Sequence, residues 1–300
     1  MYLYYPGCAL KETGKVYDES IQAVFSHLNI PYQELPDWNC CGATSYMAIN
    51  ELKAFTLAAR NLALAEQAMD ESGNIEVVTP CNACYLVLNK TQHYMQEYPD
   101  IAEKVQNALK AGGLEYQGTV KVRHPIDVMV NDYGLDQLSQ KVSRPLSGVK
   151  IACYYGCQMV RPYSKFDDQE NPVTMDQLML ALGAETVNWS MKTRCCGGSL
   201  IGTVKDVGLR LNYILLQEAK RYKADVVATA CSLCQFNMEC YQDTISRKYE
   251  RFNLPIAYFS QIIGMALGIP GKELGLHRLF VPFNPIIKPV KKGGADYVNA

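Results

Sequence analysis

Hydrophobic and polar positions follow the same succession of patterns in the two halves of the chain. Each half opens with an apolar run typical of a buried strand, at Tyr2–Tyr5 and at Val149–Tyr155. Stretches with strand and helix periodicity then alternate, and each half closes with an apolar strand and a short helix, at Val120–Val130 and Ile256–Leu267. The intervening predicted strands are Tyr32–Leu35, Ile75–Thr79, Glu185–Asn188 and Asp225–Thr229, and the predicted helices are Tyr17–Leu28, Glu51–Glu71, Met175–Leu182 and Lys205–Tyr222.

This alternation predicts an α/β fold with parallel sheets, because crossover helices are what join parallel strands. Two pseudo-symmetric βα repeats are expected, the first over residues 1–140 and the second over residues 148–270. The stretch Asp132–Gly148 is the predicted linker between them. Residues 271–300 are predicted to form a C-terminal tail that is either a solvated terminus or an arm that docks on a partner.

Composition narrows the function classes. The formal net charge is −1, so no basic stripe of the kind that nucleic acids require is expected. The N-terminal residues lack the features of a signal peptide, and no apolar run is long enough to cross a membrane. We therefore expect a cytoplasmic chain whose cysteines stay reduced. The chain has 12 cysteines, and metal or redox chemistry is the leading interpretation of them.

Three cysteine motifs occur twice in the same order and at similar intervals. Each half contains a single cysteine after glycine, then Cys-Cys-Gly, then Cys-x-x-Cys. The patterned cysteines are Cys8, Cys40, Cys41, Cys81 and Cys84 in the first half and Cys157, Cys195, Cys196, Cys231 and Cys234 in the second. Tetrahedral zinc and ordinary cubane clusters take four ligands. Five thiols in each half therefore suggest an unusual cluster, although structural zinc in one or both halves stays an alternative.

This tandem pattern resembles the cysteine-rich CCG domains of the heterodisulfide reductase B-subunit, especially those of bacterial members. The phrases Tyr5-Pro-Gly-Cys8, Asn39-Cys-Cys-Gly42 and Arg194-Cys-Cys-Gly-Gly198 carry the resemblance. It implies that each set of five cysteines binds one noncubane 4Fe–4S cluster. It also implies disulfide reduction or dithiol oxidation between the two clusters, with a small thiol, disulfide or lipoate-type compound as substrate. The implied partners are a ferredoxin-like C-subunit and a flavin-bearing A-subunit.

Three residues leave alternatives open. Cys153 competes with Cys157 as the fifth ligand of the second half, and Cys157 is favoured because Gly156-Cys157 matches Gly7-Cys8. Cys240 is interpreted as a residue that fills space in the core or at the surface and binds no metal. His124, where a predicted strand ends, is either a proton donor in catalysis or a capping residue.

Two other functions compete with disulfide chemistry. In the first, the chain is a CCG electron-transfer component of a lactate or glycolate oxidase, or of a succinate dehydrogenase type complex, and passes electrons to quinone. In the second, it is a zinc-stabilised scaffold.

Overall fold

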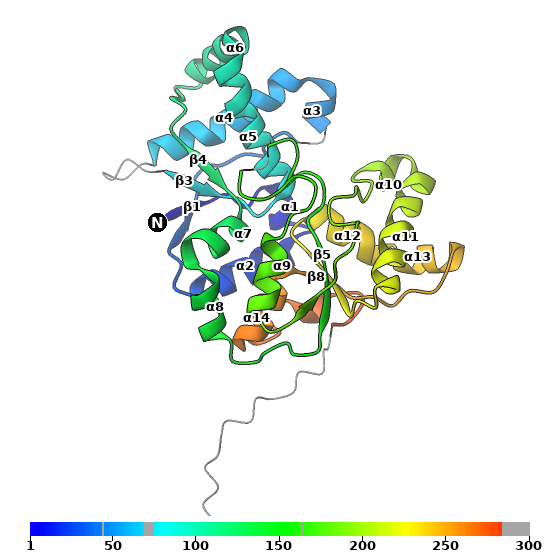
Figure 1. Ribbon diagram of the computed structural model, residues 1–300. Helices are drawn as coiled ribbons and strands as arrows, with labels where there is room; N and C mark the ends of the chain where they lie inside the picture. Colours follow the sequence, from blue (N-terminus) through cyan, green and yellow to red (C-terminus); the bar gives the residue numbers. More distant parts are fainter. Residues whose placement is uncertain (44, 69–74, 164, 284–300) are drawn as a thin grey trace, which may run out of the picture.

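Two parallel sheets form the framework of the molecule (Figure 1). The computed structural model describes residues 1–43, 45–68, 75–163 and 165–283. The first sheet has the order β2-β1-β3-β4 and the second the order β6-β5-β7-β8, with every neighbouring pair parallel. The strands are β1 (Tyr2–Tyr4), β2 (Tyr32–Glu34), β3 (Glu76–Val78), β4 (Lys121–Arg123), β5 (Lys150–Tyr154), β6 (Glu185–Thr186), β7 (Val226–Thr229) and β8 (Ile256–Tyr258). The two orders match strand for strand, which confirms the α/β class and the internal repeat.

The outer face of each sheet is covered by the helices that follow Cys-Cys-Gly and Cys-x-x-Cys. These helices are α3 (Ser45–Ile49), α4 (Glu51–Gln67), α5 (Asn82–Glu97) and α6 (Pro99–Ala111) in the first repeat, and α10 (Leu200–Thr203), α11 (Lys205–Arg221), α12 (Ser232–Cys240) and α13 (Gln242–Lys248) in the second. Side chains alternate across β5: Ala152 and Tyr154 pack toward α11, whereas Ile151 and Cys153 point to the other face.

The remaining helices lie between the two sheets and join the repeats (Figure 1). They are α1 (Cys8–Lys11), α2 (Lys15–His27), α7 (Pro125–Asp127), α8 (Leu135–Lys141), α9 (Thr174–Ala181) and α14 (Phe259–Leu267). Helix α14 of the second repeat packs on α2 of the first, and α7 of the first repeat packs against α9 of the second. Helices of the two repeats are therefore in direct contact. The Ser20 and Ser260 hydroxyls lie 2.6 Å apart, and the Tyr17 and Tyr258 rings stack with centroids 4.3 Å apart. One hydrophobic core therefore runs through both repeats.

Local details differ from the sequence predictions. The predicted linker contains α8, whose residue Leu138 is fully buried. It also contains Ser143 and Arg144, which donate backbone hydrogen bonds to the Ala266 carbonyl. The Cys-x-x-Cys helices, for which no bounds are predicted from the sequence, begin one residue after the first cysteine, which has an extended backbone. A π-helical turn over Val128–Tyr133 follows α7, and a 3-10 turn over Leu276–Arg278 precedes the end of the described chain. Residues 284–300, most of the predicted docking arm, lie outside the described residues.

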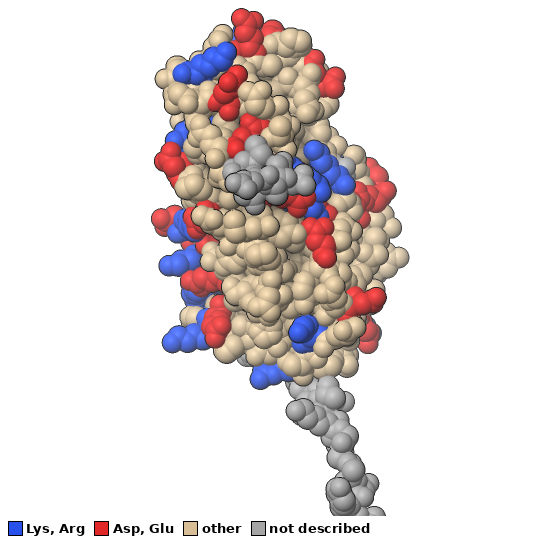
Figure 2. Space-filling view, turned by 90° about the vertical axis from the view of Figure 1, so that its left-hand side faces the viewer, with Lys and Arg blue, Asp and Glu red and all other residues tan. Residues whose placement is uncertain are grey.

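Surface charge and the hydropathy of the helices agree with what the composition predicts. On the face shown in Figure 2, lysine and arginine side chains lie beside acidic ones and do not gather into one basic patch. Within the described ranges, no helix is both long enough and apolar enough to cross a membrane.

Candidate metal centre

Two of the three cysteine motifs in each repeat lie beyond the carboxyl ends of adjacent strands. Cys8 follows β1 and Cys81 follows β3; in the second repeat, Cys157 follows β5 and Cys231 follows β7. The chain leaves β1 toward β2 on one side and reaches β3 on the other, so the connections diverge at this point. In open parallel sheets such a switch in strand order leaves a crevice at the carboxyl edge, where ligands bind. The topology therefore explains why the cysteines of each repeat meet there.

The first repeat brings its five patterned cysteines into one group. The Cys8 and Cys40 sulfurs are 3.5 Å apart, and the Cys41 and Cys84 sulfurs are 3.2 Å apart. Cys40 and Cys41 are adjacent in the chain, Cys81 and Cys84 belong to one Cys-x-x-Cys motif, and all five cysteines line the same cavity. We call this group the first site.

The second repeat builds the corresponding group. The Cys196 and Cys234 sulfurs are 3.4 Å apart. Cys157 and Cys195 each shift the pKa of the other, so they lie side by side, and Cys231 belongs to the same Cys-x-x-Cys motif as Cys234. We call these five cysteines the second site.

Equivalent hydrogen bonds hold the two Cys-Cys-Gly loops in place. The Tyr5 hydroxyl donates to the Asn39 carbonyl at 2.8 Å, and the Tyr154 hydroxyl donates to the Arg194 carbonyl at 2.6 Å. Each of these carbonyls belongs to the residue immediately before the double cysteine. The amide of Asn61 on α4 holds the Asn39 backbone through two hydrogen bonds of 2.9 Å, and Asn212 on α11 donates to the Cys196 carbonyl at 2.8 Å. A buried tyrosine and a buried asparagine thus hold the backbone of the double cysteine in each repeat.

Protons are divided unequally among the thiols. A hydrogen bond from Cys41 lowers the pKa of Cys40 to about 5, and one from Cys157 lowers the pKa of Cys195 to about 6. The same contacts raise the pKa of Cys41 and Cys157 well above the usual thiol range. Thiolates are the form of cysteine that binds metals. Cys40 and Cys195, which occupy the same position in the two repeats, are therefore the thiols most ready to do so.

The donor set fits a thiolate-bound iron group. Five thiols in each site exceed the four that zinc or a cubane cluster takes, and iron–sulfur clusters are held by cysteine thiolates. All 12 cysteines carry free thiols. No three His, Cys, Asp or Glu side chains in the described part of the chain are already arranged to hold a single metal ion. The sulfurs instead form contacting pairs, which a bound group would separate.

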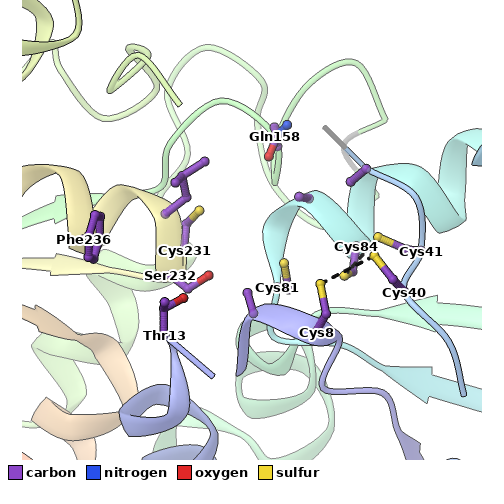
Figure 3. Close-up of a pocket in the computed structure, with 14 residues that line it drawn as sticks. Cys8, Thr13, Cys40, Cys41, Cys81, Cys84, Gln158, Cys231, Ser232 and Phe236 are labelled. Atoms are coloured by element: carbon purple, nitrogen blue, oxygen red, sulfur yellow. Dashed lines mark hydrogen bonds between the residues drawn. The ribbon is translucent and has the colours of Figure 1, made fainter. Parts of the chain in front are cut away.

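A cavity of about 350 Å³ joins the two repeats at this position (Figure 3). All five cysteines of the first site line one wall, and Thr13, Cys231, Ser232 and Phe236 stand opposite them. Gln158, next to Cys157, closes a further side. The other described lining residues are Ala9, Ala43, Ala83 and Leu233. Apart from the cysteines, the described lining is therefore apolar or carries uncharged hydrogen-bonding groups.

Two predicted alternatives lie away from the sulfur groups. Cys153 is fully buried on the inner face of β5, in a hydrophobic core separate from the one that holds Cys196, Cys231 and Cys234. Cys240, the last residue of α12, is not among the cavity-lining residues described here.

His124 is fully buried at the start of α7, where its Nδ1 accepts a hydrogen bond from the Ile126 amide at 3.2 Å. Burial lowers the pKa of His124 to about 3, so its ring is neutral, and it is absent from the described cavity lining. These observations describe the capping residue that the sequence offered as one alternative; a role as proton donor stays a prediction.

Several residues at the site carry no sequence signal as functional groups. Thr13, Gln158 and Ser232 reach the cavity only through the packing of one repeat on the other. Asn82, between the cysteines of the first Cys-x-x-Cys, donates to the Tyr155 carbonyl of the second repeat at 3.0 Å. Its position inside the motif is the one clue that the sequence offered.

A family model described as a cysteine-rich domain matches residues 2–89 and again residues 151–239. This chain belongs to the CCG cysteine-rich domain family. Each matched range contains one complete set of five patterned cysteines, so the tandem CCG resemblance is confirmed.

Three relatives align over most of their length. The chain is 32% identical to the 8-methylmenaquinol:fumarate reductase membrane anchor subunit of Wolinella succinogenes, over 92% of this chain and 95% of that protein. It is 30% identical to a protein of Archaeoglobus profundus named as similar to the heterodisulfide reductase B-subunit, over 95% and 96% of the two chains. It is 27% identical to the B-subunit of the ferredoxin:CoB-CoM heterodisulfide reductase of Methanosarcina mazei, over 91% of each.

A solved structure shares the fold. The crystal structure of a hypothetical protein from Helicobacter pylori superimposes with a TM-score of 0.75 at 17% sequence identity. The alignment covers 94% of this chain and 52% of that one, so this chain spans about half of the longer protein.

Proposed function

We propose that this CCG protein is the iron–sulfur B-subunit of a heterodisulfide-reductase-like complex, and that it reduces a disulfide or oxidises a dithiol. One observation carries the proposal: a single cavity between the repeats is lined by all five cysteines of the first site and by Cys231 of the second. In this proposal the first site and the second site each hold one noncubane 4Fe–4S cluster. The ligands would be Cys8, Cys40, Cys41, Cys81 and Cys84 in the first site and Cys157, Cys195, Cys196, Cys231 and Cys234 in the second.

The placement of two sites around one cavity suits the electron count. Reduction of a disulfide consumes two electrons and two protons and yields two thiols. Each bound cluster supplies one electron when loaded. Residues of the chain place the substrate: Thr13, Ser232 and Gln158 offer hydrogen bonds, and Leu233 and Phe236 exclude water from the wall opposite the first site. A substrate segment inside the cavity is therefore expected to be uncharged, as in a small neutral thiol, a disulfide or a lipoyl-type ring.

The electrons have to come from other proteins of the complex. The relative from M. mazei is named as part of a ferredoxin-dependent heterodisulfide reductase. In the same way, we propose a ferredoxin-like C-subunit and a flavin-bearing A-subunit as partners in the cytoplasm.

A second candidate is electron transfer to quinone without disulfide chemistry. The observation that favours it is the identity of 32% to a component of a menaquinol:fumarate reductase, over nearly the whole of both chains. In that case the cavity would hold a neutral quinone ring, which its uncharged lining also suits.

Anaerobic purification with iron, sulfide and zinc analysis tests the proposal. The expected result is about eight iron ions per chain, four for each cluster, and an EPR signal that appears when a thiol is added. Zinc without iron would refute the proposal. Two clusters without any response to thiols or disulfides, together with reduction of a menaquinone analogue, would favour the second candidate.

A further inference from the structure

One buried hydrogen bond distinguishes the second site from the first. The Asn237 amide nitrogen on α12 lies 3.6 Å from the Cys196 sulfur and 2.8 Å from the Gly198 carbonyl oxygen. Asn237 is fully buried. A carbonyl oxygen only accepts hydrogen bonds, so the NH₂ end of the amide must face the Cys-Cys-Gly loop. The orientation of Asn237 is thus fixed by its surroundings, and it offers an N–H group to the sulfur.

Among the described residues, no side-chain amide donates to a sulfur of the first site in this way. Asn237 stands three residues after Cys234, and the residue three positions after Cys84 is Val87. Val87 is also buried on the corresponding helix α5. A valine side chain has no hydrogen to donate to a sulfur, so the repeat supplies its own comparison between the two sites.

A nearby charge differs in the same direction. Arg161 stands four residues after Cys157, and the residue four positions after Cys8 is Glu12. The Arg161 guanidinium donates to the Thr193 carbonyl at 2.5 Å, two residues before Cys195. A cation is therefore held against the loop of the second site, where the equivalent position of the first repeat carries an acidic residue.

We propose that Asn237 raises the reduction potential of the cluster in the second site through its N–H···S hydrogen bond to Cys196, and that this makes the two clusters inequivalent. The proposal rests on the proposed function, because it needs a cluster in that site. Reduction adds negative charge to a thiolate-bound cluster, and hydrogen bonds to its sulfurs stabilise that charge. Asn237 is a positioning residue in this scheme, since it acts through Cys196, and Arg161 adds to the effect.

The two sites also differ in the burial of their cysteines. Cys157 is less exposed than Cys8, and burial disfavours the added charge. The effect of Asn237 is therefore measured against its own removal, rather than by comparing the two sites of the native protein.

The test is an EPR redox titration of the iron-loaded full chain and of its Asn237→Val variant. Asn237→Val is expected to shift the reduction equilibrium of one cluster toward the oxidised form by about tenfold, or about 59 mV for one electron, while the other cluster is unchanged. Asn89→Val is the matched control. Asn89 is also buried, and it donates a hydrogen bond to the Tyr85 carbonyl on α5 rather than to a Cys-Cys-Gly loop. Its variant should lower stability with less than a twofold shift in the reduction equilibrium of either cluster.

The reciprocal variant Val87→Asn covers the case in which Asn237→Val does not load its cluster. It is expected to raise the potential of the first-site cluster, with iron content equal to that of the native protein. Equal potentials in the native protein, Asn237→Val and Val87→Asn would overturn the inference and leave the proposed function intact. Absence of iron from the native protein would instead remove the proposed function itself.

Discussion

Replacing Gly7 by alanine is expected to disable the first site, whereas the equivalent change Gly156→Ala should leave the second site largely intact. Both glycines precede the first cysteine of their repeat, and both have positive φ angles, +73° and +71°. They differ in what an added methyl group would meet. A Cβ atom at Gly7 would lie 2.7 Å from the Cys84 sulfur, whereas one at Gly156 would lie 3.3 Å from the Cys234 sulfur.

The free-energy cost has a shared part and a part specific to Gly7. Gly7 has φ 73° and ψ 164°, a region that is essentially restricted to glycine, and another residue there costs about 1–3 kcal/mol. A similar backbone cost is expected at Gly156. The contact of 2.7 Å adds an overpacking cost of about 1–3 kcal/mol at Gly7, because Cys84 is fully enclosed and has little room to move. At 3.3 Å, a shift of a few tenths of an ångström relieves most of the clash.

Iron content after anaerobic reconstitution measures the difference. Gly7→Ala should retain about half of the native iron, since the displaced atom is itself a proposed ligand, while Gly156→Ala should retain nearly all of it. Urea unfolding of the two apoproteins serves as the control, and both variants should be destabilised. Equal iron in the two variants, or full iron in Gly7→Ala, would refute the reasoning from these distances.

Three further predictions concern the second site, the cavity and a buried acid. Cys157→Ala should lose iron from the second site, whereas Cys153→Ala should keep it, because only Cys157 contacts the other cysteines; iron analysis decides. Because the described cavity lining is uncharged, the neutral 2-mercaptoethanol should elicit the thiol-dependent EPR signal at a lower concentration than the anionic 2-mercaptoethanesulfonate. Ser232→Lys should reverse this order, and equal responses to the two thiols would contradict the prediction. Burial raises the pKa of Glu239 from 4.5 to about 7. The protonated acid is therefore favoured in the fold, and native protein should lose about 3 kcal/mol relative to Glu239→Gln as the pH rises from 4.5 to 7, as measured by urea unfolding.

Much of the fold could be predicted because the pattern occurs twice. The alternation of strands and helices is local information, and it placed all eight strands within a few residues of their bounds. The sequence assigned the patterned cysteines to two sets of five because the same three motifs occur in the same order in each half. Gly156 identified Cys157 as the equivalent of Cys8, which lies beside Cys40 in the structure.

The remaining features depend on contacts between the repeats, which periodicity does not encode. Helix α8 has the composition of a linker, and only its packing beside α9 makes it part of the fold. His124 was offered both as a catalytic group and as a cap. Its burial, which decides whether it can carry a proton near neutral pH, depends on Phe166 and Phe259 from the second repeat. Asn237 resembles any other polar residue of a helix until its distance to a sulfur is known.

The packing of helices across the repeats is what brings the two similar units together around one cavity. A single CCG unit would leave α2 or α14 without the surface on which it packs, and the stacked Tyr17 and Tyr258 rings would lose their partners. Because this interface is a continuous core, the position of Ser232 opposite the first site is set by the packing of whole helices rather than by a mobile loop. The cavity is lined by all five first-site cysteines but by only Cys231 of the second, so the pseudo-symmetry is already broken where substrate would bind. Under the proposed function, two clusters that deliver one electron each in sequence would benefit from such inequivalence, and the hydrogen bond from Asn237 to Cys196 would act on the cluster of the site that contributes fewer cysteines to the cavity.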